Sequence, residues 1–247
     1  MAHTGVVYAR PKKNGEPFSF GVSGKLWRDS LVMYDRSTLS LWSQVLGQAV
    51  AGPLEGMKLE QIPSEVTAWA AWKERHPDTL VLVKPAGQDS AYAEYHRDPK
   101  KVGIAGSKTP DARLPGKTLV FGMILSDRFA AAPFPVLDTS PVLNNEFSGI
   151  PIVIFSPAGE NAAMAFERTI DGKALTFEHV VDQGRLTVRD IGTGSTWSWE
   201  SGECLQGPFK GKHLKRIPGM PVYWAIWARF HPDTELISRE MGKPLNE

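Results

Sequence analysis

Most of the chain is patterned as short apolar runs separated by turns rich in glycine, proline and lysine, which is typical of β-strands joined by hairpins. In the first fifty residues these runs are 6–9, 18–21 and 31–34. A second series follows at residues 118–125, 150–155, 162–166, 175–177 and 185–188. Residues 85–116, between the two series, have the weakest pattern, so we predict that they form a linker. The pattern therefore predicts a β-rich protein in two parts.

Two short segments instead place apolar residues at helical spacing. The first carries Val66, Trp69, Trp72 and His76 at offsets of three, three and four. These offsets place all four residues on one face of a helix. We expect this helix to begin near Ser64, which suits an N-cap, and to end before Pro77, because the residue before proline avoids the α region. In the second segment Pro221 suits the first turn, and Pro232 ends the helix. Each tryptophan pair is expected to pack its helix onto the sheet of its own part.

Both helices belong to an internal repeat. Residues 35–79 and 190–234 align without a gap at a displacement of 155 (190 − 35), and 19 of 45 positions are identical, against about three expected by chance. The repeated residues that we interpret as structural are Trp69, Trp72, His76 and Asp78 in the first repeat and Trp224, Trp227, His231 and Asp233 in the second. A residue kept in both copies serves a scaffold more often than a single active site. We therefore infer an ancestral duplication.

Each repeat opens with an aspartate, Asp35 or Asp190, followed by small polar residues that favour a turn. In the first repeat an alternating stretch follows, in which Thr38, Ser40 and Trp42 would share one face of a strand. The sequence therefore predicts a turn that leads directly into a strand.

Composition adds mainly exclusions. The 247 residues are 42% hydrophobic and 22% charged, as in ordinary globular proteins, and a net charge of +1 provides no field that would attract nucleic acid or an anionic membrane. No apolar run is long enough for a membrane span, and the N-terminal residues lack the pattern of a signal peptide, so we expect a soluble protein with no indicated compartment. Cys204 is the single cysteine, which excludes an internal disulfide and a multi-cysteine metal site in one chain.

Short motifs for catalysis are weak. Residues 103–109 and the sequence Gly116-Lys117-Thr118 resemble phosphate loops only loosely, because spacing or context fails in each. Gly21-Val-Ser-Gly24 is one residue short of a nucleophile elbow. Nucleotide binding and serine hydrolysis are therefore not predicted.

Differences between the repeats are a better guide to a functional site than similarities. The first repeat has Tyr34, Arg36, Gln44 and Gln48 where the second has Arg189, Ile191, Trp199 and Glu203. Together with residues nearby in the sequence, they define a candidate polar cleft in the first part of the chain. Its members are His3, Trp27, Tyr34, Asp35, Arg36, Gln44 and Gln48.

Several of these motifs resemble a known family. The runs Met33-Tyr-Asp-Arg36, Ser40-Leu-Trp-Ser-Gln44 and His76-Pro-Asp-Thr79 are similar to those of the bacterial and archaeal domain-of-unknown-function family three-one-seven-nine, and the match extends through essentially the whole chain. The resemblance implies two units. It also implies that a Cys-Pro-Leu-Cys element normally precedes the position of His3, so this chain is expected to be shortened at its N-terminus. Residues 156–159 of the second unit keep only the proline of that element.

The resemblance also bears on function, although the family has no established activity. A Cys-x-x-Cys element near a histidine would suit a transition metal or a dithiol couple in full-length relatives. Within this chain we expect no cofactor and no metal site. Many relatives resemble exported proteins.

We therefore predict a β-rich α+β fold with two homologous lobes, each a small, mostly antiparallel sheet or barrel with a short Trp-x-x-Trp helix. The predicted divisions are residues 1–84 for an N-terminally incomplete first lobe, 85–116 for the linker and 117–247 for the second lobe. Two hypotheses about function stay open: a thiol- or metal-associated redox or metal-handling protein, and a non-catalytic module that binds a small molecule or protein in the cleft between lobes. Whether the chain is an enzyme also stays open. An exposed edge of the first lobe is expected to form a homodimer.

Overall fold

The computed structural model describes residues 2–62, 64–81, 93–103, 111–125, 127–182 and 185–237, together with Val83 and Thr109. Short strands dominate, and among the described pairings only one, between β10 and β22, is parallel. The predicted β-rich α+β class is therefore confirmed.

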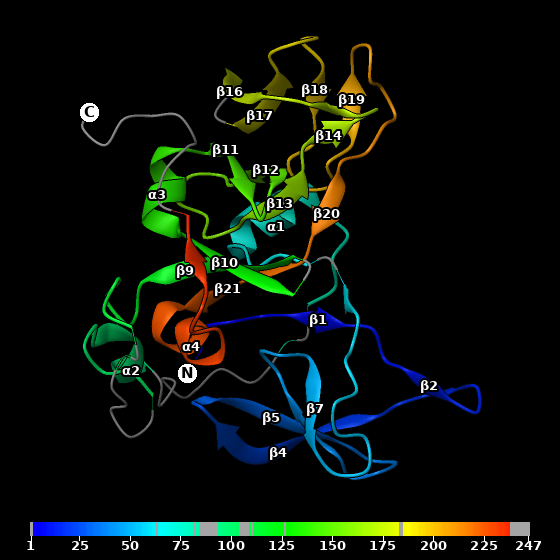
Figure 1. Cartoon of the computed structure of the whole chain (residues 1–247), viewed down its shortest axis with the longest axis vertical. Coiled ribbons are helices and arrows are strands. Elements are labelled where there is room, and N and C mark those ends of the chain that lie inside the picture. Colours follow the sequence, from blue (N-terminus) through cyan, green and yellow to red (C-terminus); the bar gives the residue numbers. More distant parts are fainter. Residues whose placement is uncertain are drawn as a thin grey trace.

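Within the described residues, four sheets of four strands follow one another from the bottom to the top of Figure 1. The N-terminal sheet contains β4 (Phe20–Trp27), β5 (Ser30–Asp35), β6 (Leu41–Ser43) and β7 (Gln48–Ala51). The next sheet has the order β21 (Gly219–Tyr223), β9 (Leu119–Leu125), β10 (Arg128–Pro133), β22 (Glu235–Leu236). The third has the order β11 (Val142–Phe147), β12 (Ile150–Phe155), β13 (Met164–Glu167), β20 (Lys215–Ile217). The C-terminal sheet contains β16 (Phe177–Asp182), β17 (Arg185–Asp190), β18 (Thr196–Trp197) and β19 (Cys204–Gln206).

Small strand pairs and short helices complete the described chain. The pairs are β1 (Val7–Tyr8) with β8 (Gln61–Ile62), β2 (Lys12–Lys13) with β3 (Glu16–Pro17), and β14 (Thr169–Ile170) with β15 (Lys173–Ala174). The helices are α1 (Trp69–Arg75), α2 (Ala93–Arg97), α3 (Phe134–Thr139) and α4 (Trp224–Phe230). The predicted linker 85–116 contains α2, and much of the rest of it lies outside the described residues.

The two predicted helices end where expected and begin later than expected. His76 and His231 are the C-caps, directly before the prolines. Ser64 and Pro221 are not helix starts, because each N-cap lies several residues further on, at Ala68 or Tyr223. In the second repeat the pairing of residues 219–223 with β9 holds this stretch as β21, so tertiary hydrogen bonds override the local preference.

The same polar turn opens both repeats. The Asp35 carboxylate is fully buried and accepts hydrogen bonds from the Thr38 backbone (2.6 Å), the Thr38 hydroxyl (2.7 Å) and the Trp42 indole (3.0 Å). Asp190 accepts the corresponding bonds from the Thr193 backbone (2.7 Å) and the Trp197 indole (3.2 Å). The turn therefore fixes the buried indole that begins the core of each terminal sheet.

In the second repeat, α4 packs against β9 and β21. Trp224, Ala225, Ile226, Trp227, Ala228 and Phe230 are all buried. Trp227 lies against the backbone of Gly122 on β9, where an added Cβ would come within 2.4 Å of the indole. On β10, Phe129 stacks on His231 with ring centroids 4.0 Å apart. The tryptophan pair of α4 therefore packs on the strand pair β9–β10.

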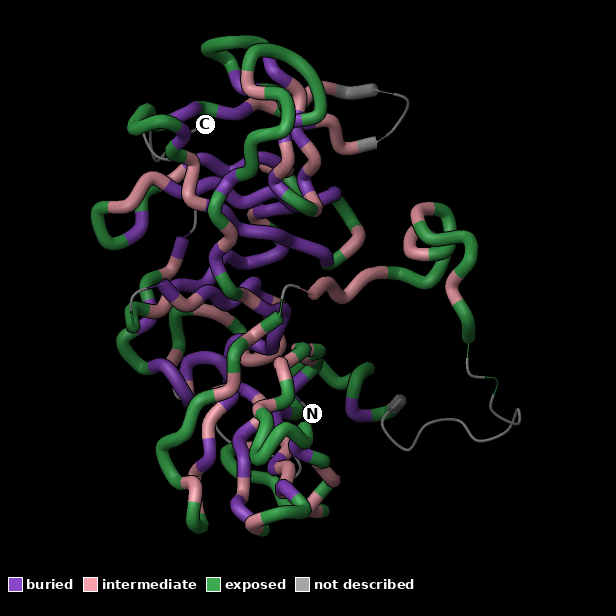
Figure 2. Tube along the Cα trace, turned by 90° about the vertical axis from the view of Figure 1, so that its right-hand side faces the viewer, coloured by how far each residue is buried: buried purple, intermediate pink, exposed green. Residues whose placement is uncertain are grey.

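The equivalent helix α1 has no buried residue, and Trp69 is 51% exposed. The expectation that both tryptophan pairs pack onto a sheet of their own lobe is therefore wrong for the first pair. The physical reason is that no strand pair among the described residues lies under α1 as β9–β10 lies under α4. The segment that carries α1 stands out from the body of the protein on the right of Figure 2.

Each repeated helix contacts a segment from the other half of the chain. At the end of α4, Phe230 meets Trp27 edge to face at 5.3 Å, and Arg229 pairs with Asp29. At the end of α1, Arg75 pairs with Glu160 and Glu200 of the C-terminal half. The halves are therefore joined by reciprocal helix contacts.

His231 gives this fold an expected acid sensitivity. Burial lowers the pKa of His231 from 6.5 to about 4, and its Nε2 atom is buried without a hydrogen-bond partner. Below pH 6.5 the unfolded chain therefore binds a proton at His231, whereas the folded chain does not bind it until the pH approaches 4. The free energy of unfolding should fall by about 2–3 kcal/mol between pH 6.5 and pH 4 through this residue and then level off. Urea titrations across this range should show a shallower slope for His231→Phe, and an unchanged slope would contradict the assignment.

Candidate functional site

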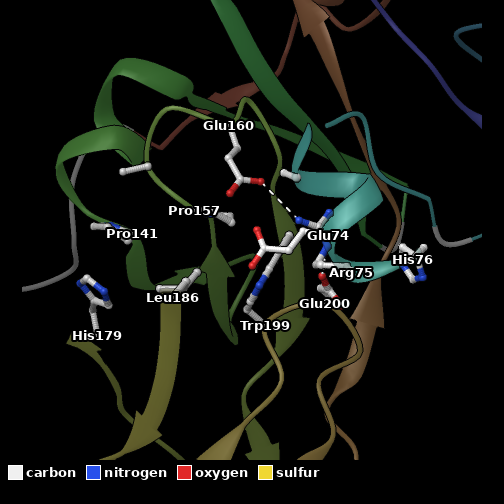
Figure 3. A pocket seen from close by; sticks show the side chains of 12 residues that line it. Glu74, Arg75, His76, Pro141, Pro157, Glu160, His179, Leu186, Trp199 and Glu200 are labelled. Atoms are coloured by element: carbon white, nitrogen blue, oxygen red, sulfur yellow. Dashed lines mark ion pairs between the residues drawn. The ribbon is translucent and has the colours of Figure 1, made fainter. Parts of the chain in front are cut away.

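A cavity of about 680 Å³ lies between α1 and the C-terminal half (Figure 3). We call it the α1 cavity. From α1 it is lined by Ala71, Glu74, Arg75 and His76, and from the facing half by Pro141, Pro157, Ala158, Glu160, His179, Leu186, Trp199 and Glu200. It therefore lies at a junction between segments of the two repeats.

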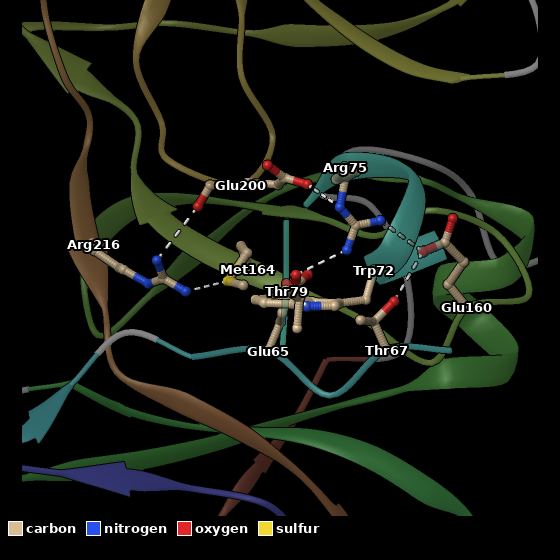
Figure 4. A network of polar contacts seen from close by, with 9 residues as sticks. All are labelled: Glu65, Thr67, Trp72, Arg75, Thr79, Glu160, Met164, Glu200 and Arg216. Carbon is tan, nitrogen blue, oxygen red and sulfur yellow. Dashed lines mark hydrogen bonds and ion pairs between the residues drawn. The ribbon is translucent and has the colours of Figure 1, made fainter. Parts of the chain in front are cut away.

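One guanidinium surrounded by three carboxylates dominates this cavity. Arg75 lies 2.8 Å from Glu65, 3.5 Å from Glu160 and 2.6 Å from Glu200, measured between charged nitrogen and oxygen atoms (Figure 4). We call these four residues the Arg75 cluster. Its formal charge is −2, from three carboxylates and one guanidinium. Burial alone would lower the pKa of Arg75, but the hydrogen bond that Arg75 donates to Glu65 and the charges of Glu65, Glu200 and Glu160 raise it overall, so the guanidinium stays charged.

The carboxylates are not fully satisfied by Arg75. Oε2 of Glu65 and Oε1 of Glu200 are buried and have no hydrogen-bond partner. Glu200 Oε1 approaches Arg75 Nε at 2.6 Å without the alignment of a hydrogen bond, so the pair is ionic contact only. Thr67 donates to the remaining carboxylate, Glu160, at 3.3 Å. Buried acceptors without donors are costly, and at Glu200, which lines the cavity, a donor on a ligand would relieve that cost.

Trp199 provides an aromatic surface beneath the cluster. Its indole is 9% exposed, and the Arg75 guanidinium carbon lies 5.6 Å from the ring centroid. This distance is within the range of a cation–π interaction. The cavity thus combines excess negative charge with an aromatic face, the two features that bind an organic cation.

Sequence reasoning missed this cavity although the signal was present. The cluster residues have no polar counterparts in the other copy: Glu65 aligns with Met220, Arg75 with Phe230 and Glu200 with Val45. These differences between the copies are of the same kind as those at Tyr34, Arg36, Gln44 and Gln48, and Trp199 is itself the counterpart of Gln44.

Two of the predicted cleft residues, His3 and Gln44, share a second cavity of about 540 Å³ with Asp29 and His96. Here His3 stacks on Tyr223 at 5.0 Å and meets His96 edge to face at 5.6 Å. Burial and the charge of His96 lower the pKa of His3. Gln44 also fixes this region through its backbone carbonyl, which accepts a bond from the Tyr8 hydroxyl at 2.7 Å.

The other predicted cleft residues lie apart from this pair. Trp27 and Gln48 line a third cavity of about 560 Å³ on the N-terminal sheet. Arg36 donates to the Tyr34 hydroxyl at 2.9 Å on the exposed side of that sheet. Asp35 is enclosed in the turn described above. The seven residues are therefore distributed over four places.

The repeated residues occupy matching local positions. The indole nitrogen of Trp72 donates to Thr79 at 2.9 Å, and that of Trp227 donates to Thr234 at 2.8 Å. Asp78 and Asp233 are exposed in the turn after each helix, and Trp224 donates to the Asp111 carbonyl.

Metal and thiol groups are sparse among the described residues. No three histidine, cysteine, aspartate or glutamate side chains there come together in a way that could hold a metal ion. Cys204 is fully buried, and burial raises the pKa of its thiol. Gly116-Lys117-Thr118 also has a local role, since Lys117 donates to the backbone carbonyls of Tyr95 and Asp98 in and after α2. Residues 104–108 of the other loosely loop-like motif lie outside the described residues.

Comparison with known proteins gives one match. None of the curated proteins and none of the solved structures matches the chain. Among the described helices, none has both the length and the apolar character needed to cross a bilayer. A family model described as "Protein of unknown function (DUF3179)" matches residues 1–234, which is nearly the whole chain, so the protein belongs to the DUF3179 family.

Proposed function

We propose that this chain is a non-catalytic binding protein that takes a small organic cation, an amine or guanidinium compound, in the α1 cavity. The observation that carries the proposal is the Arg75 cluster, in which three carboxylates gather around the Arg75 guanidinium above Trp199. Arg216 adds a second positive charge that acts on Glu65, and Glu74 adds a further carboxylate to the cavity lining, so the excess of negative charge remains. With a formal charge of −2 the cluster attracts a further cation and repels an anion.

The volume and the lining of the α1 cavity suit a small ligand. A volume of about 680 Å³ falls within the range of about 300–1,000 Å³ that is usual for small-molecule sites. Leu186, Pro157 and Trp199 supply apolar walls, and Glu160 and Glu200 supply acceptors. The ligand should therefore carry its positive group at one end and an apolar or aromatic part beside it.

We also infer that the two repeats descend from one duplicated unit, as their sequence identity suggests. The matching aspartate turns and indole–threonine bonds support this inference. On that view the copies diverged at the Arg75 cluster, because Glu65, Arg75 and Glu200 each align with an apolar residue in the other copy. Such divergence would leave one binding site where the two copies meet, with Arg75 from the first and Glu200 from the second.

The thiol- or metal-dependent hypothesis has less support from the residues of this chain. Its cysteine, Cys204, has a thiol pKa raised by burial, which disfavours the reactive thiolate. For that reason we prefer the binding hypothesis.

Isothermal titration calorimetry with agmatine, spermidine and choline tests the proposal. We expect at least one of these cations to bind, and its affinity to fall about tenfold or more in Glu200→Gln and in Trp199→Leu, since each variant removes one recognition feature. Glu178→Gln is the matched control, because Glu178 is an exposed carboxylate paired with Arg189 outside the cavity.

Arg75→Gln separates the two ligand classes. A cation should keep or gain affinity when the competing guanidinium is removed, whereas an anionic ligand would lose it. Absence of binding by all three cations, or binding that Glu200→Gln and Trp199→Leu leave unchanged, would overturn the proposal.

A further inference from the structure

The surface around α1 exposes apolar residues of the kind that usually pack against a β-sheet, and no sheet among the described residues covers them. Trp69 is 51% exposed, and the residues after the helix, Leu80, Val81 and Val83, are 95%, 57% and 86% exposed. This concentration of apolar residues on one exposed segment marks an interaction surface more often than chance exposure does. We call Trp69, Trp72, His76, Leu80 and Val81 the α1 face.

The second repeat shows what such a face contacts. There α4 rests on a four-stranded sheet in the order β21-β9-β10-β22. The outer strands, β21 and β22, directly precede and follow α4 in the sequence, and the inner strands β9 and β10 form a hairpin. In the first repeat the counterparts of the outer strands are residues 64–68 and 80–81, and no strand pairing is assigned to either of them. Only the inner hairpin has no counterpart among the described residues.

The local geometry of α1 is already that of the covered helix. Trp72 and His76 have ring centroids 4.1 Å apart, against 4.2 Å for Trp227 and His231. The C-cap backbone angles are −131° and 69° at His76, and −131° and 74° at His231. The α1 face therefore needs no rearrangement to receive the same kind of partner.

We propose that the α1 face is a docking site for a β-hairpin of a partner polypeptide, inserted between residues 64–68 and 80–81 as an inner strand pair. The required chemistry follows from β9–β10. One strand carries a glycine under Trp72, as Gly122 lies under Trp227, and the other carries an aromatic residue that stacks on His76, as Phe129 stacks on His231. The strand next to residues 80–81 runs parallel to them, as β10 runs parallel to β22.

Main-chain bonds would fix the register of the hairpin. In the second repeat the carbonyls of Gly116 and Thr118, just before β9, accept from the first amides of α4 at 2.9 and 2.8 Å. On the other side the amide of Ile237 donates to Ala131 at 2.9 Å. The first two bonds hold the start of the helix and the third continues the β10–β22 pairing, so a docked hairpin would make the corresponding bonds to α1 and to the residues after it. The α1 face shares His76 with the α1 cavity, but none of the contacts that support docking involves a ligand in that cavity.

A fusion protein tests the docking site with a hairpin of known fit. Residues 115–133 of the chain itself are joined ahead of residue 2 through a linker of about 20 glycine and serine residues, which spans about 25 Å on average. Tethering raises the effective concentration of the hairpin, so that even a weak hairpin can dock. We expect hydrogen exchange of the α1 amides to slow by about tenfold or more relative to the unfused chain.

Two matched controls make the result decisive. The first is a fusion whose extra hairpin carries valine at the position of Gly122, where a Cβ would collide with the indole. The second carries the intact hairpin on a chain with Trp72→Ala. Both should leave exchange at α1 as fast as in the unfused chain.

No slowing with the intact hairpin, or equal slowing with the valine-bearing one, would overturn the proposal. Sedimentation of the unfused chain tests the alternative that a second copy of the chain occupies the α1 face. If the unfused chain is a dimer, and Trp69→Ala and Trp72→Ala each make it monomeric, the α1 face binds a second copy of the chain. That result would also overturn the proposal.

Discussion

Replacing Trp227 with alanine is expected to lower the free energy of unfolding by about 3–5 kcal/mol, whereas the same change at Trp72 should cost less than about 1 kcal/mol. The two residues are aligned in the repeat, and each donates its indole hydrogen to a threonine seven residues later. They differ in burial, because Trp227 is fully buried against Gly122 and α1 has no buried residue. The difference in unfolding free energy between the two variants therefore measures how much packing against the strand pair β9–β10 contributes to stability.

Urea unfolding followed by far-ultraviolet circular dichroism provides the measurement, with both variants compared at one pH. Phe230→Leu serves as a milder change in the same helix, since it keeps an apolar side chain at a buried position. Equal losses for Trp227→Ala and Trp72→Ala would mean that α1 is covered in solution. That result would contradict the packing described for the first repeat.

Replacing Asp35 with alanine is expected to cost about 3–5 kcal/mol of unfolding free energy at pH 7. The variant leaves the Thr38 amide and the Trp42 indole nitrogen buried without an acceptor, and hydrogen bonds to a charged group contribute about 1.5–3 kcal/mol each. Asp190→Ala should have a similar effect, because the same bonds recur around it.

Asp35 also predicts how stability changes in acid. Burial would raise the pKa of Asp35, but hydrogen bonds from Thr38, Trp42 and Ser37 lower it from 3.8 to about 2. The unfolded chain is therefore protonated at a higher pH than the folded chain. The stability that this carboxylate contributes is present above about pH 4 and should be lost as the pH falls toward 2, by about 2–3 kcal/mol in total.

Unfolding at several pH values between 5 and 2 checks this expectation. Asp35→Asn keeps the shape of the side chain and removes its charge, so it should flatten the slope in this range while Asp35→Ala lowers stability throughout. A slope identical to that of the unchanged protein in Asp35→Asn would show that the carboxylate is not the group responsible. The window also separates Asp35 from His231, whose effect falls between pH 6.5 and 4.

Several repeated residues occupy the turns and helix ends that their local sequence predicts. Asp35 and Asp190 form turns that hold an indole, and His76 and His231 cap helices before proline. These features are local in sequence, so spacing and residue type are enough to predict them. Burial of Trp69 was predicted wrongly, because burial depends on a surface supplied from elsewhere.

The site depended on contacts that no local pattern encodes. Arg75 and Glu200 are 125 positions apart (200 − 75) and meet only because α1 reaches across to the other half. The predicted cleft residues came from one stretch of sequence, and the fold distributes them over several surfaces. Only His3 and Gln44 of that set line the same cavity.

By itself the sequence determined the β-rich class, the register of the repeat, the aspartate turns and the ends of the helices, because each depends on backbone preferences within about ten residues. Only the tertiary structure decided which tryptophan pair is buried, where carboxylates gather around Arg75 and which strands have no partner. These features depend on surfaces brought together from distant parts of the chain, and two similar local sequences have different surroundings when only one of them has a sheet beneath it.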